Sequence, residues 1–281
     1  MNKYVITGGE GFIGSKIVQA VDGFSFDIKS NHDILDKNDF IKTVEDANGI
    51  FHCAAKISVP ESITVPELYF RTNVEGTKCV IESAQAAGLK IVFSSSAAVY
   101  GESEKPVNEE TALAPKSPYA ENKKEGEELL KKSSTPHIAL RYFNVYGPGQ
   151  SSQYAGVITA FIINALKGED LIIYGDGKQT RDFIFVDDVV KANIAAMNYP
   201  NETFEVFNIA SGEKTTIKKL AETIIRLTGS SSKISFQQAR LGDIVFSVAD
   251  ISKAKNILKW YPESSLEDGL IKTINFYRGR L

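Results

Sequence analysis

The sequence predicts an α/β fold in which a doubly wound parallel sheet forms the larger domain and a smaller lobe follows toward the C-terminus. Short apolar segments rich in β-branched residues alternate with longer amphipathic segments along much of the chain. The first apolar segment leads into three glycines spaced three residues apart and then into a helical pattern. Continuous apolar strands separated by helices are typical of a parallel sheet that helices cover on both faces.

Six strands are expected in this sheet, each from a short apolar run. They are the segments 4–7, 24–26, 49–54, 90–96, 137–143 and 204–210. The helices between them carry their own boundary signals. The segment 74–88 has apolar residues at helical spacing and ends in Gly88, which favours a helix stop. The segment 117–133 opens with serine and proline, which favour a helix start.

The chain changes character after Phe143. Two segments rich in glycine and polar residues, 144–156 and 174–183, follow the main run of strands. Glycine and serine clusters between periodic segments indicate loops, and loops of this kind often border or gate a site. We therefore predict two functional loops here.

The segment 213–281 is predicted to form the smaller lobe. It mixes helices, such as 216–229, with a single predicted strand at 233–238. We interpret it as a substrate-binding lobe at the carboxyl ends of the main strands, where open α/β sheets bind ligands. The expected division gives the larger domain residues 1–146 and 183–212, and the lobe residues 147–182 and 213–281.

Composition excludes several classes of function. The formal net charge of −3 gives no general attraction for nucleic acid or for an anionic membrane. The first strand begins by about Lys3, which leaves no room for a cleaved signal, and no apolar run approaches the roughly 18 residues of a membrane span.

Cys53 and Cys79 are expected to be reduced, buried thiols, which suits a cytoplasmic protein. No metal site is expected, and we assign no catalytic role to the three histidines, His32, His52 and His137.

The glycine turn predicts a dinucleotide site. Gly8, Gly11 and Gly14 follow a strand and open a helix, so the backbone can approach a pyrophosphate at the free N–H groups of the helix N-terminus. The glycines alone would fit a tight turn equally well. Asp27, at the end of the second strand, adds a carboxylate for the adenosine ribose hydroxyls, and the combination indicates NAD. A carboxylate repels the 2′-phosphate of NADP, although Lys29 nearby moderates that preference.

Three further residues suggest redox chemistry at a hydroxyl group. Tyr119 and Lys123 are four apart on a predicted helix, so their side chains share one face, although such pairs are common by chance. Ser96 stands at the end of the fourth strand, at the edge where α/β sheets place their chemistry. A neighbouring ammonium and a cationic nicotinamide both stabilise a phenolate. The three side chains can therefore remove a hydroxyl proton while NAD takes the hydride.

Nearly the whole chain resembles the extended short-chain dehydrogenase/reductase family, and within it the nucleotide-sugar 4-epimerases related to UDP-galactose 4-epimerase. The motifs occur in the family's order: "TGGEGFIGS", "HCAA", "NVEGT", "SSSAAVYG", "YAENK", "LRYFNVYGPGQ", "GDGKQTRDFIFVDD", "FNIASGE" and "ARLGDI". The resemblance implies a Rossmann-type NAD-binding domain, a UDP-sugar substrate and a homodimer built on a helix bundle that includes the helices around 74–88 and 119–132.

The resemblance also implies a role for each candidate residue. Ser96 would hydrogen-bond the reacting 4-hydroxyl, Tyr119 would be the base and Lys123 would orient the nicotinamide ribose. The residues expected along NAD are Gly8, Gly11, Phe12, Ile13, Gly14, Asp27, Asp33, Ile34, Ala54, Ala55, Asn73, Tyr119, Lys123 and Tyr142. The residues expected along the UDP-sugar are Ser96, Asn144, Val157, Tyr174, Arg181, Arg240, Asp243 and Ser247.

Within the substrate set, Arg181 and Arg240 would clamp the diphosphate, because guanidinium forks match phosphate oxygens. Asp243 would accept from the nucleoside ribose, and Tyr174 would stack on the uracil. Structural alternatives stay open, since the two arginines could form salt bridges with Asp182 or Asp243 and the tyrosine could belong to the core. Alternatives also stay open at three cofactor positions. Asp33 could be an ordinary loop carboxylate, Ala54 a small strand-end residue and Asn73 a capping residue.

The residues after Ser96 help to choose an activity. Related dehydratases carry an acidic pair there, whereas this chain has Ala97 and Ala98, which disfavours elimination of water. Four residues after the "RLGD" aspartate, where a bulky tyrosine narrows the pocket of some epimerases, stands Ser247, which leaves room for a 2-acetamido group. We predict 4-epimerisation of UDP-glucose/UDP-galactose and of UDP-GlcNAc/UDP-GalNAc through a 4-keto sugar. The alternatives are a reductase or dehydratase acting on a nucleotide sugar, and a NAD-binding protein without catalysis.

Overall fold

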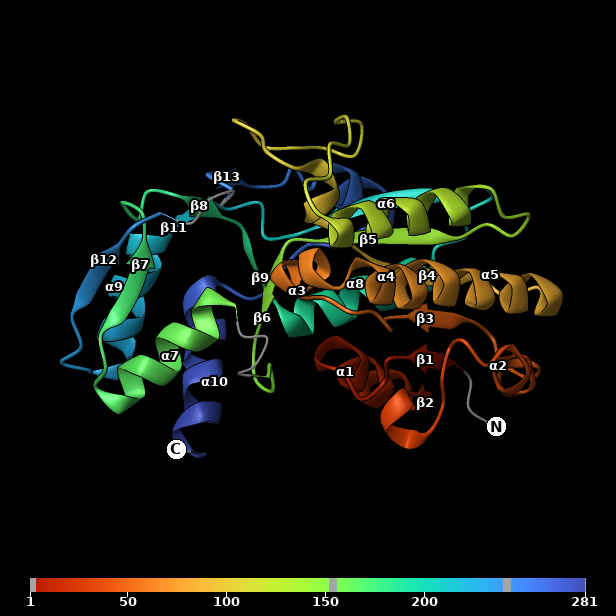
Figure 1. Cartoon of the computed structure of the whole chain (residues 1–281), viewed down its shortest axis with the longest axis horizontal. Helices are drawn as coiled ribbons and strands as arrows, with labels where there is room; N and C mark the ends of the chain where they lie inside the picture. The colour runs from red at the N-terminus through yellow and green to blue at the C-terminus, as the bar shows by residue number, and fades with distance from the viewer. Residues whose placement is uncertain (1–3, 152–155, 240–243, 281) are drawn as a thin grey trace.

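The computed structural model describes residues 4–151, 156–239 and 244–280, and it contains a six-stranded parallel sheet in the order β10-β5-β4-β3-β1-β2 (Figure 1). All six predicted strands are confirmed. Their bounds are β1 (Val5–Thr7), β2 (Phe24–Phe26), β3 (Ile50–His52), β4 (Ile91–Ser96), β5 (Ile138–Tyr142) and β10 (Glu205–Ile209). The α/β, doubly wound Rossmann-type sheet is therefore confirmed.

Helices cover both faces of this sheet. Successive residues of a strand point to opposite faces, so both faces carry apolar side chains that must be buried. Val5 packs into one apolar cluster and Ile6 into the other. On one side, α1 (Phe12–Val21) packs against α8 (Val186–Asn198). On the other side, α2 (Lys37–Val44), α5 (Gly76–Ala87) and α6 (Pro118–Lys131) form a continuous layer.

The two predicted helix boundaries have the expected capping contacts. Ser117 caps α6, since its side chain accepts a hydrogen bond from the Ala120 amide. Gly88 ends α5 in the left-handed conformation, with φ of 66°. Between β3 and α5 the chain forms two short helices and a π-helical turn that sequence periodicity does not reveal. They are α3 (Val59–Thr64), α4 (Pro66–Phe70) and η2 (Arg71–Glu75).

A second apolar cluster lies beside the large sheet, at the left of Figure 1. Its elements are α7 (Val157–Lys167), β7 (Leu171–Tyr174), α9 (Ile217–Thr228), β12 (Ile234–Gln237) and α10 (Leu266–Arg278). The predicted helix 216–229 and strand 233–238 are confirmed as α9 and β12. In contrast, Ala254, Leu258 and Trp260 pack into the core of the large sheet, although they follow the start of the predicted lobe.

The predicted loops at 144–156 and 174–183 are confirmed at 147–151 and 175–179, but strands occupy their ends, and the prediction of a single strand after residue 213 is wrong. The structure has short strands there: β6 (Asn144–Tyr146), β8 (Thr180–Arg181), β9 (Phe183–Phe185), β11 (Thr215–Thr216) and β13 (Phe246–Ser247). Strand β6 pairs with β9, and β8 lies between β11 and β13. Strands this short show no readable alternation, and partners distant in sequence determine them.

Candidate active site

The turn after β1 requires its glycines for steric reasons. Gly8 has φ of 67°, and a Cβ there would lie 2.7 Å from the Ala54 amide nitrogen. A Cβ on Gly14 would lie 2.1 Å from the Gly8 carbonyl oxygen, so only glycine lets α1 approach the turn this closely. Gly11 precedes the first turn of α1, where Phe12 and Ile13 present amides that lack partners within the helix. These features fit the pyrophosphate of a dinucleotide.

Asp27 ties the glycine turn to the end of β2. Its carboxylate accepts from the backbone amides of Glu10 and Lys29, each over 3.0 Å, and the side chain is buried. A carboxylate has about four acceptor positions, so it can also serve a ribose hydroxyl. Of its predicted neighbours, Asp33 accepts from the Leu35 amide over 3.0 Å, and Ile34 lies in the apolar core.

The chain after β3 forms the opposite wall of this turn. The Ala54 amide donates to the Thr7 hydroxyl over 3.2 Å, and Ala55 follows it along the same wall. Asn73, on the π-helical turn, pairs with both backbone groups of Lys56, over 2.8 Å from the amide and 2.9 Å to the carbonyl. The Asn73 side chain thus holds the wall in place, which favours the structural alternative for this residue.

The structure brings the three catalytic candidates together. Ser96 ends β4, while Tyr119 and Lys123 lie one turn apart near the start of α6. The buried Lys123 ammonium donates to the Ser94 carbonyl oxygen over 2.7 Å. Burial raises the pKa of Tyr119, and a hydrogen bond with the Ser96 side chain partly offsets that rise. Burial lowers the pKa of Lys123 to about 8, so the ammonium form prevails at neutral pH.

Tyr142 lies beside this group but its hydroxyl is occupied by protein contacts. It stands opposite Ser96 in the pairing of β5 with β4. Its hydroxyl donates to the Asn193 side chain over 2.9 Å and lies 3.2 Å from the Ser94 hydroxyl oxygen. The Tyr142 hydroxyl therefore joins β5 to α8.

Three of the predicted substrate residues, Asn144, Arg181 and Ser247, lie on the short strands. Arg181 on β8 stands opposite Ser247 on β13, so their side chains share one face of the small sheet. The Asn144 side chain donates to the Asp182 carbonyl oxygen over 2.9 Å. The buried Asp182 carboxylate accepts from the amides of Ser211, Gly212 and Ala249.

Two other substrate candidates occupy the ends of elements in the second cluster. Tyr174 ends β7, and Val157 begins α7. Arg240 and Asp243 lie outside the described residues. The diphosphate clamp and the nucleoside contact therefore remain predictions.

Comparison with known proteins decides the family. A family model described as the NAD dependent epimerase/dehydratase family matches residues 4–210. The chain belongs to this family. The predicted resemblance and the NAD cofactor are thereby confirmed, and the turn at Gly8 has the geometry that the cofactor needs.

Relatives of this chain differ in activity at similar identity. A UDP-glucose 4-epimerase of Mycolicibacterium smegmatis is 35% identical over 311 residues, which cover 98% of this chain and 98% of that protein. A UDP-N-acetyl-alpha-D-glucosaminuronate decarboxylase of Bacillus cytotoxicus is 34% identical over 312 residues, with 98% and 97% covered.

A solved structure is also similar over its whole length. The UDP-N-acetylglucosamine 4-epimerase of Methanobrevibacter ruminantium, in complex with UDP-N-acetylmuramic acid, matches with a TM-score of 0.93 and 36% identity. The match covers 100% of this chain and 99% of that one. The chain is therefore an enzyme of a family that includes UDP-sugar epimerases and decarboxylases.

One buried acid near these residues was not predicted from the sequence. Glu127 lies on α6 one turn after Lys123 and two turns after Tyr119. The sequence did contain a sign of it, because Tyr119, Lys123 and Glu127 follow one another at intervals of four and therefore share one helix face. A glutamate is ordinarily exposed, so the pattern alone suggested solvent.

The histidines and cysteines have structural surroundings. His52 lies between the hydroxyls of Thr7 and Thr77, at 2.7 and 2.9 Å, and burial lowers its pKa to about 3. Cys53 and Cys79 are free thiols, half-buried rather than fully buried as predicted. Within residues 4–151, 156–239 and 244–280, no group of three or more metal-ligating side chains comes together, and no helix is long and apolar enough to cross a bilayer.

Proposed function

We propose that this protein is a nucleotide-sugar 4-epimerase that interconverts UDP-glucose and UDP-galactose, and also UDP-GlcNAc and UDP-GalNAc. The observation that carries the proposal is the convergence of Ser96, Tyr119 and Lys123 at the carboxyl end of β4. The glycine turn at Gly8 lies at the same edge of the parallel sheet. A base for a sugar hydroxyl and a NAD site are thus side by side.

Each of the three side chains has a separate task in this mechanism. Tyr119, as the phenolate, takes the proton of the sugar 4-hydroxyl, and Ser96 holds that hydroxyl by a hydrogen bond. Because burial raises the pKa of Tyr119, the phenolate requires positive charge beside it, from Lys123 and from the nicotinamide. The Lys123 ammonium stabilises the phenolate electrostatically and orients the nicotinamide ribose. NAD bound at the glycine turn would supply the hydride acceptor for C4 and the hydride donor for the opposite face of the 4-keto sugar, once that sugar has turned in the pocket. Tyr119 would then return its proton to the 4-oxygen. Because no cofactor is consumed, tightly retained NAD is expected.

The short turn after β4 supports epimerisation over dehydration. Ala97 and Ala98 open this turn, and the Ala98 amide donates to the Ser96 hydroxyl over 3.2 Å. Neither side chain can donate or accept a proton, so an acid–base pair for loss of water is lacking at these two positions.

Substrate width is proposed from Ser247. This small side chain stands on β13 opposite Arg181, the proposed diphosphate ligand. The hydroxymethyl side chain of Ser247 is small enough to leave space for a 2-acetamido group. We infer that both pairs of UDP-sugars are accepted.

A second candidate is decarboxylation of a UDP-uronate, because a decarboxylase is 34% identical over nearly the whole chain. Both reactions begin with oxidation at C4. In decarboxylation the 4-keto uronate then loses its C6 carboxylate as CO₂, whereas the proposed substrates have no carboxylate there.

Proton NMR of the purified protein with UDP-glucose, UDP-GlcNAc or UDP-glucuronate, without added NAD, tests the proposal. Formation of UDP-galactose and UDP-GalNAc, with UDP-glucuronate unchanged, is the expected result. Formation of UDP-xylose and CO₂ would support the second candidate. Turnover of UDP-glucose alone would contradict the substrate width inferred from Ser247.

We also propose a cytoplasmic homodimer. The two free cysteines suit a reducing compartment. Exposed apolar side chains on α3 and α4, including Ile63, Leu68 and Phe70, lie on helices that pack against α6, one of the predicted interface helices. Light scattering of the wild type and of Phe70→Glu tests the dimer, because a charge there should favour the monomer.

A further inference from the structure

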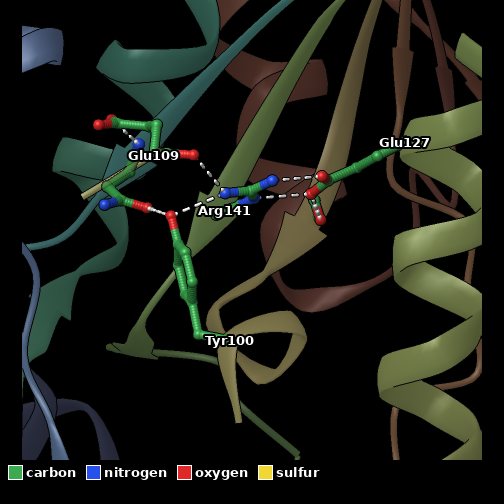
Figure 2. Close-up of polar contacts among 6 residues, drawn as sticks. Tyr100, Glu109, Glu127 and Arg141 are labelled. Atoms are coloured by element: carbon green, nitrogen blue, oxygen red, sulfur yellow. Dashed lines mark hydrogen bonds and ion pairs between the residues drawn. The ribbon is translucent and has the colours of Figure 1, made fainter. Parts of the chain in front are cut away.

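A buried ion pair joins β5 to α6 (Figure 2). The Arg141 guanidinium donates to Glu127 through two parallel bonds, Nε to Oε1 over 3.0 Å and Nη2 to Oε2 over 2.7 Å. Both side chains are 5% exposed. This fork-to-carboxylate geometry fixes both distance and orientation, which a single contact would not.

The pair belongs to a larger polar group, which we call the Arg141 cluster. Its members are Ser95, Tyr100, Glu109, Glu127, Arg141 and Asn208. The Ser95 hydroxyl donates to Glu127 over 2.5 Å, and Arg141 donates to the Tyr100 hydroxyl over 2.8 Å. Tyr100 in turn donates to Asn208 over 2.6 Å. The cluster therefore ties α6 to β4, β5, β10 and the turn that follows β4.

The elements that the cluster joins are those that carry the catalytic candidates. Glu127 lies on the α6 face that presents Tyr119 and Lys123. Ser95 directly precedes Ser96 on β4. The Glu127 carboxylate also raises the pKa of Lys123 and so opposes the effect of burial.

Stability alone is a weak explanation for this arrangement. Burying two charges costs desolvation free energy, and replacing a buried ion pair with uncharged side chains of similar volume is often neutral or stabilising. Catalysis is far more sensitive to position, because a misplacement of about 1 Å can reduce turnover roughly 100-fold. The two-point contact between α6 and β5 limits sliding and rotation of α6.

We propose that Glu127 and Arg141 are positioning residues, which set α6 so that Tyr119 and Lys123 meet Ser96 at the distance that proton transfer requires. This inference rests on the proposed function, because it assigns these three residues to catalysis. Neither Glu127 nor Arg141 contacts the substrate in this account. They act through the placement of α6.

The test compares Glu127→Gln, Arg141→Met and the double variant, each purified with its bound NAD. Each single variant leaves one buried polar partner without its counterpart, and Tm should fall. The double variant removes both charges, and Tm should return to near the wild-type value. If the pair positions α6, kcat of the double variant should stay about 10- to 100-fold below wild type while KM changes less than threefold. Recovery of kcat together with Tm would overturn the proposal.

A matched control comes from the half-buried pair of Lys253 and Glu205, whose charged atoms are 2.7 Å apart. The double variant Lys253→Met/Glu205→Gln should keep wild-type kcat, because these residues join β10 to the segment after β13 and neither lies on α6 or β5. Lys253 acts on the Arg141 cluster only through the charge of Glu109, where it opposes the rise in pKa that burial causes. A loss of kcat in this control equal to that of the test variant would also overturn the proposal.

A readout without turnover separates this inference from the proposed function. In protein labelled with ¹³C at tyrosine Cζ, the resonance of Tyr119 can be assigned from its absence in Tyr119→Phe. The Glu127→Gln/Arg141→Met variant should shift this resonance, and the Lys253→Met/Glu205→Gln control should not. An unchanged resonance in the first variant would refute the positioning role. A shift in a protein that converts no UDP-sugar would support positioning and refute the proposed function.

Discussion

The ammonium of Lys123 donates a hydrogen bond to the carbonyl oxygen of Ser94 over 2.7 Å. This contact ties α6 to β4 two residues before the strand ends at Ser96. Tyr119, the proposed base, lies one helical turn before Lys123, so the same contact limits how closely Tyr119 approaches Ser96. The account of function depends on this relationship between α6 and β4.

Removal of the phenol should abolish most of the activity. In Tyr119→Phe, kcat should fall about 100- to 10,000-fold, which is the usual contribution of a general base. NAD content and Tm should change little, since the change removes the hydrogen bond with Ser96 but keeps the buried ring. The exposed Tyr261 provides the control, because Tyr261→Phe should keep full turnover. Full turnover in Tyr119→Phe would refute the assigned base.

Lys123 should make the stability of the apoprotein depend on alkaline pH. Its pKa is about 8 in the fold and 10.5 in the unfolded chain, so the unfolded chain binds more protons between these values. Stability therefore rises with pH across this window, by about 3 kcal/mol from this group. Urea unfolding at pH 8 and pH 10 should show a smaller rise in Lys123→Met than in wild type. Equal rises would contradict the lowered pKa.

Gly14→Ala should disrupt the cofactor site. The added Cβ would lie 2.1 Å from the Gly8 carbonyl oxygen, so α1 must move away from the glycine turn. We expect loss of bound NAD, measured by absorbance after denaturation, and a lower Tm. Gly156→Ala is a matched control, because a Cβ at Gly156 meets no atom of the described residues within 4 Å and its φ of −63° suits any residue. NAD retained at wild-type level in Gly14→Ala would show that the turn tolerates displacement.

Acid should destabilise the fold through His52. Burial lowers its pKa from 6.5 to about 3, so below pH 6.5 the unfolded chain gains a proton that the folded chain does not. Stability is therefore lost as pH falls, by about 2 kcal/mol from this residue between pH 6.5 and 5. His52→Gln, which can still bridge Thr7 and Thr77, should lose about 2 kcal/mol less over this range, as measured by urea unfolding. An unchanged acid dependence would contradict the lowered pKa.

Ser247 should control the width of the sugar pocket. Ser247→Tyr should reduce kcat/KM for UDP-GlcNAc at least about 10-fold relative to UDP-glucose. A difference of one methylene group in a pocket already changes the ratio of kcat/KM between two substrates by about this factor. Ser247→Ala should leave the ratio unchanged. Equal loss for both sugars in Ser247→Tyr would place this residue away from the 2-substituent.

The large sheet was predictable because its strands are continuous apolar runs. Such runs follow from burial on both faces, and the helical segments between them mark even β1, β2 and β3, which are three residues long. The start of α6 at Ser117 and the end of α5 at Gly88 were equally predictable, since capping is local chemistry. The catalytic candidates followed from these elements, because a strand end and a helix face place Ser96, Tyr119 and Lys123.

The small sheets and the Arg141 cluster were not predictable in this way. Strand β8 is two residues long, and its partners β11 and β13 lie more than 30 residues further along the chain. The burial of Glu127 depends on Arg141, and a charged residue does not reveal a buried partner by its own neighbours in sequence. Tertiary contacts rather than local propensity determine both features.

The most direct test of the central claim follows the hydrogen on C4. UDP-glucose deuterated at C4 is incubated with the protein and no added NAD, and the product is examined by NMR and mass spectrometry. If oxidation and re-reduction occur on one retained cofactor, the UDP-galactose formed carries the deuterium at C4. Absence of product, or UDP-galactose without deuterium at C4, would contradict the account.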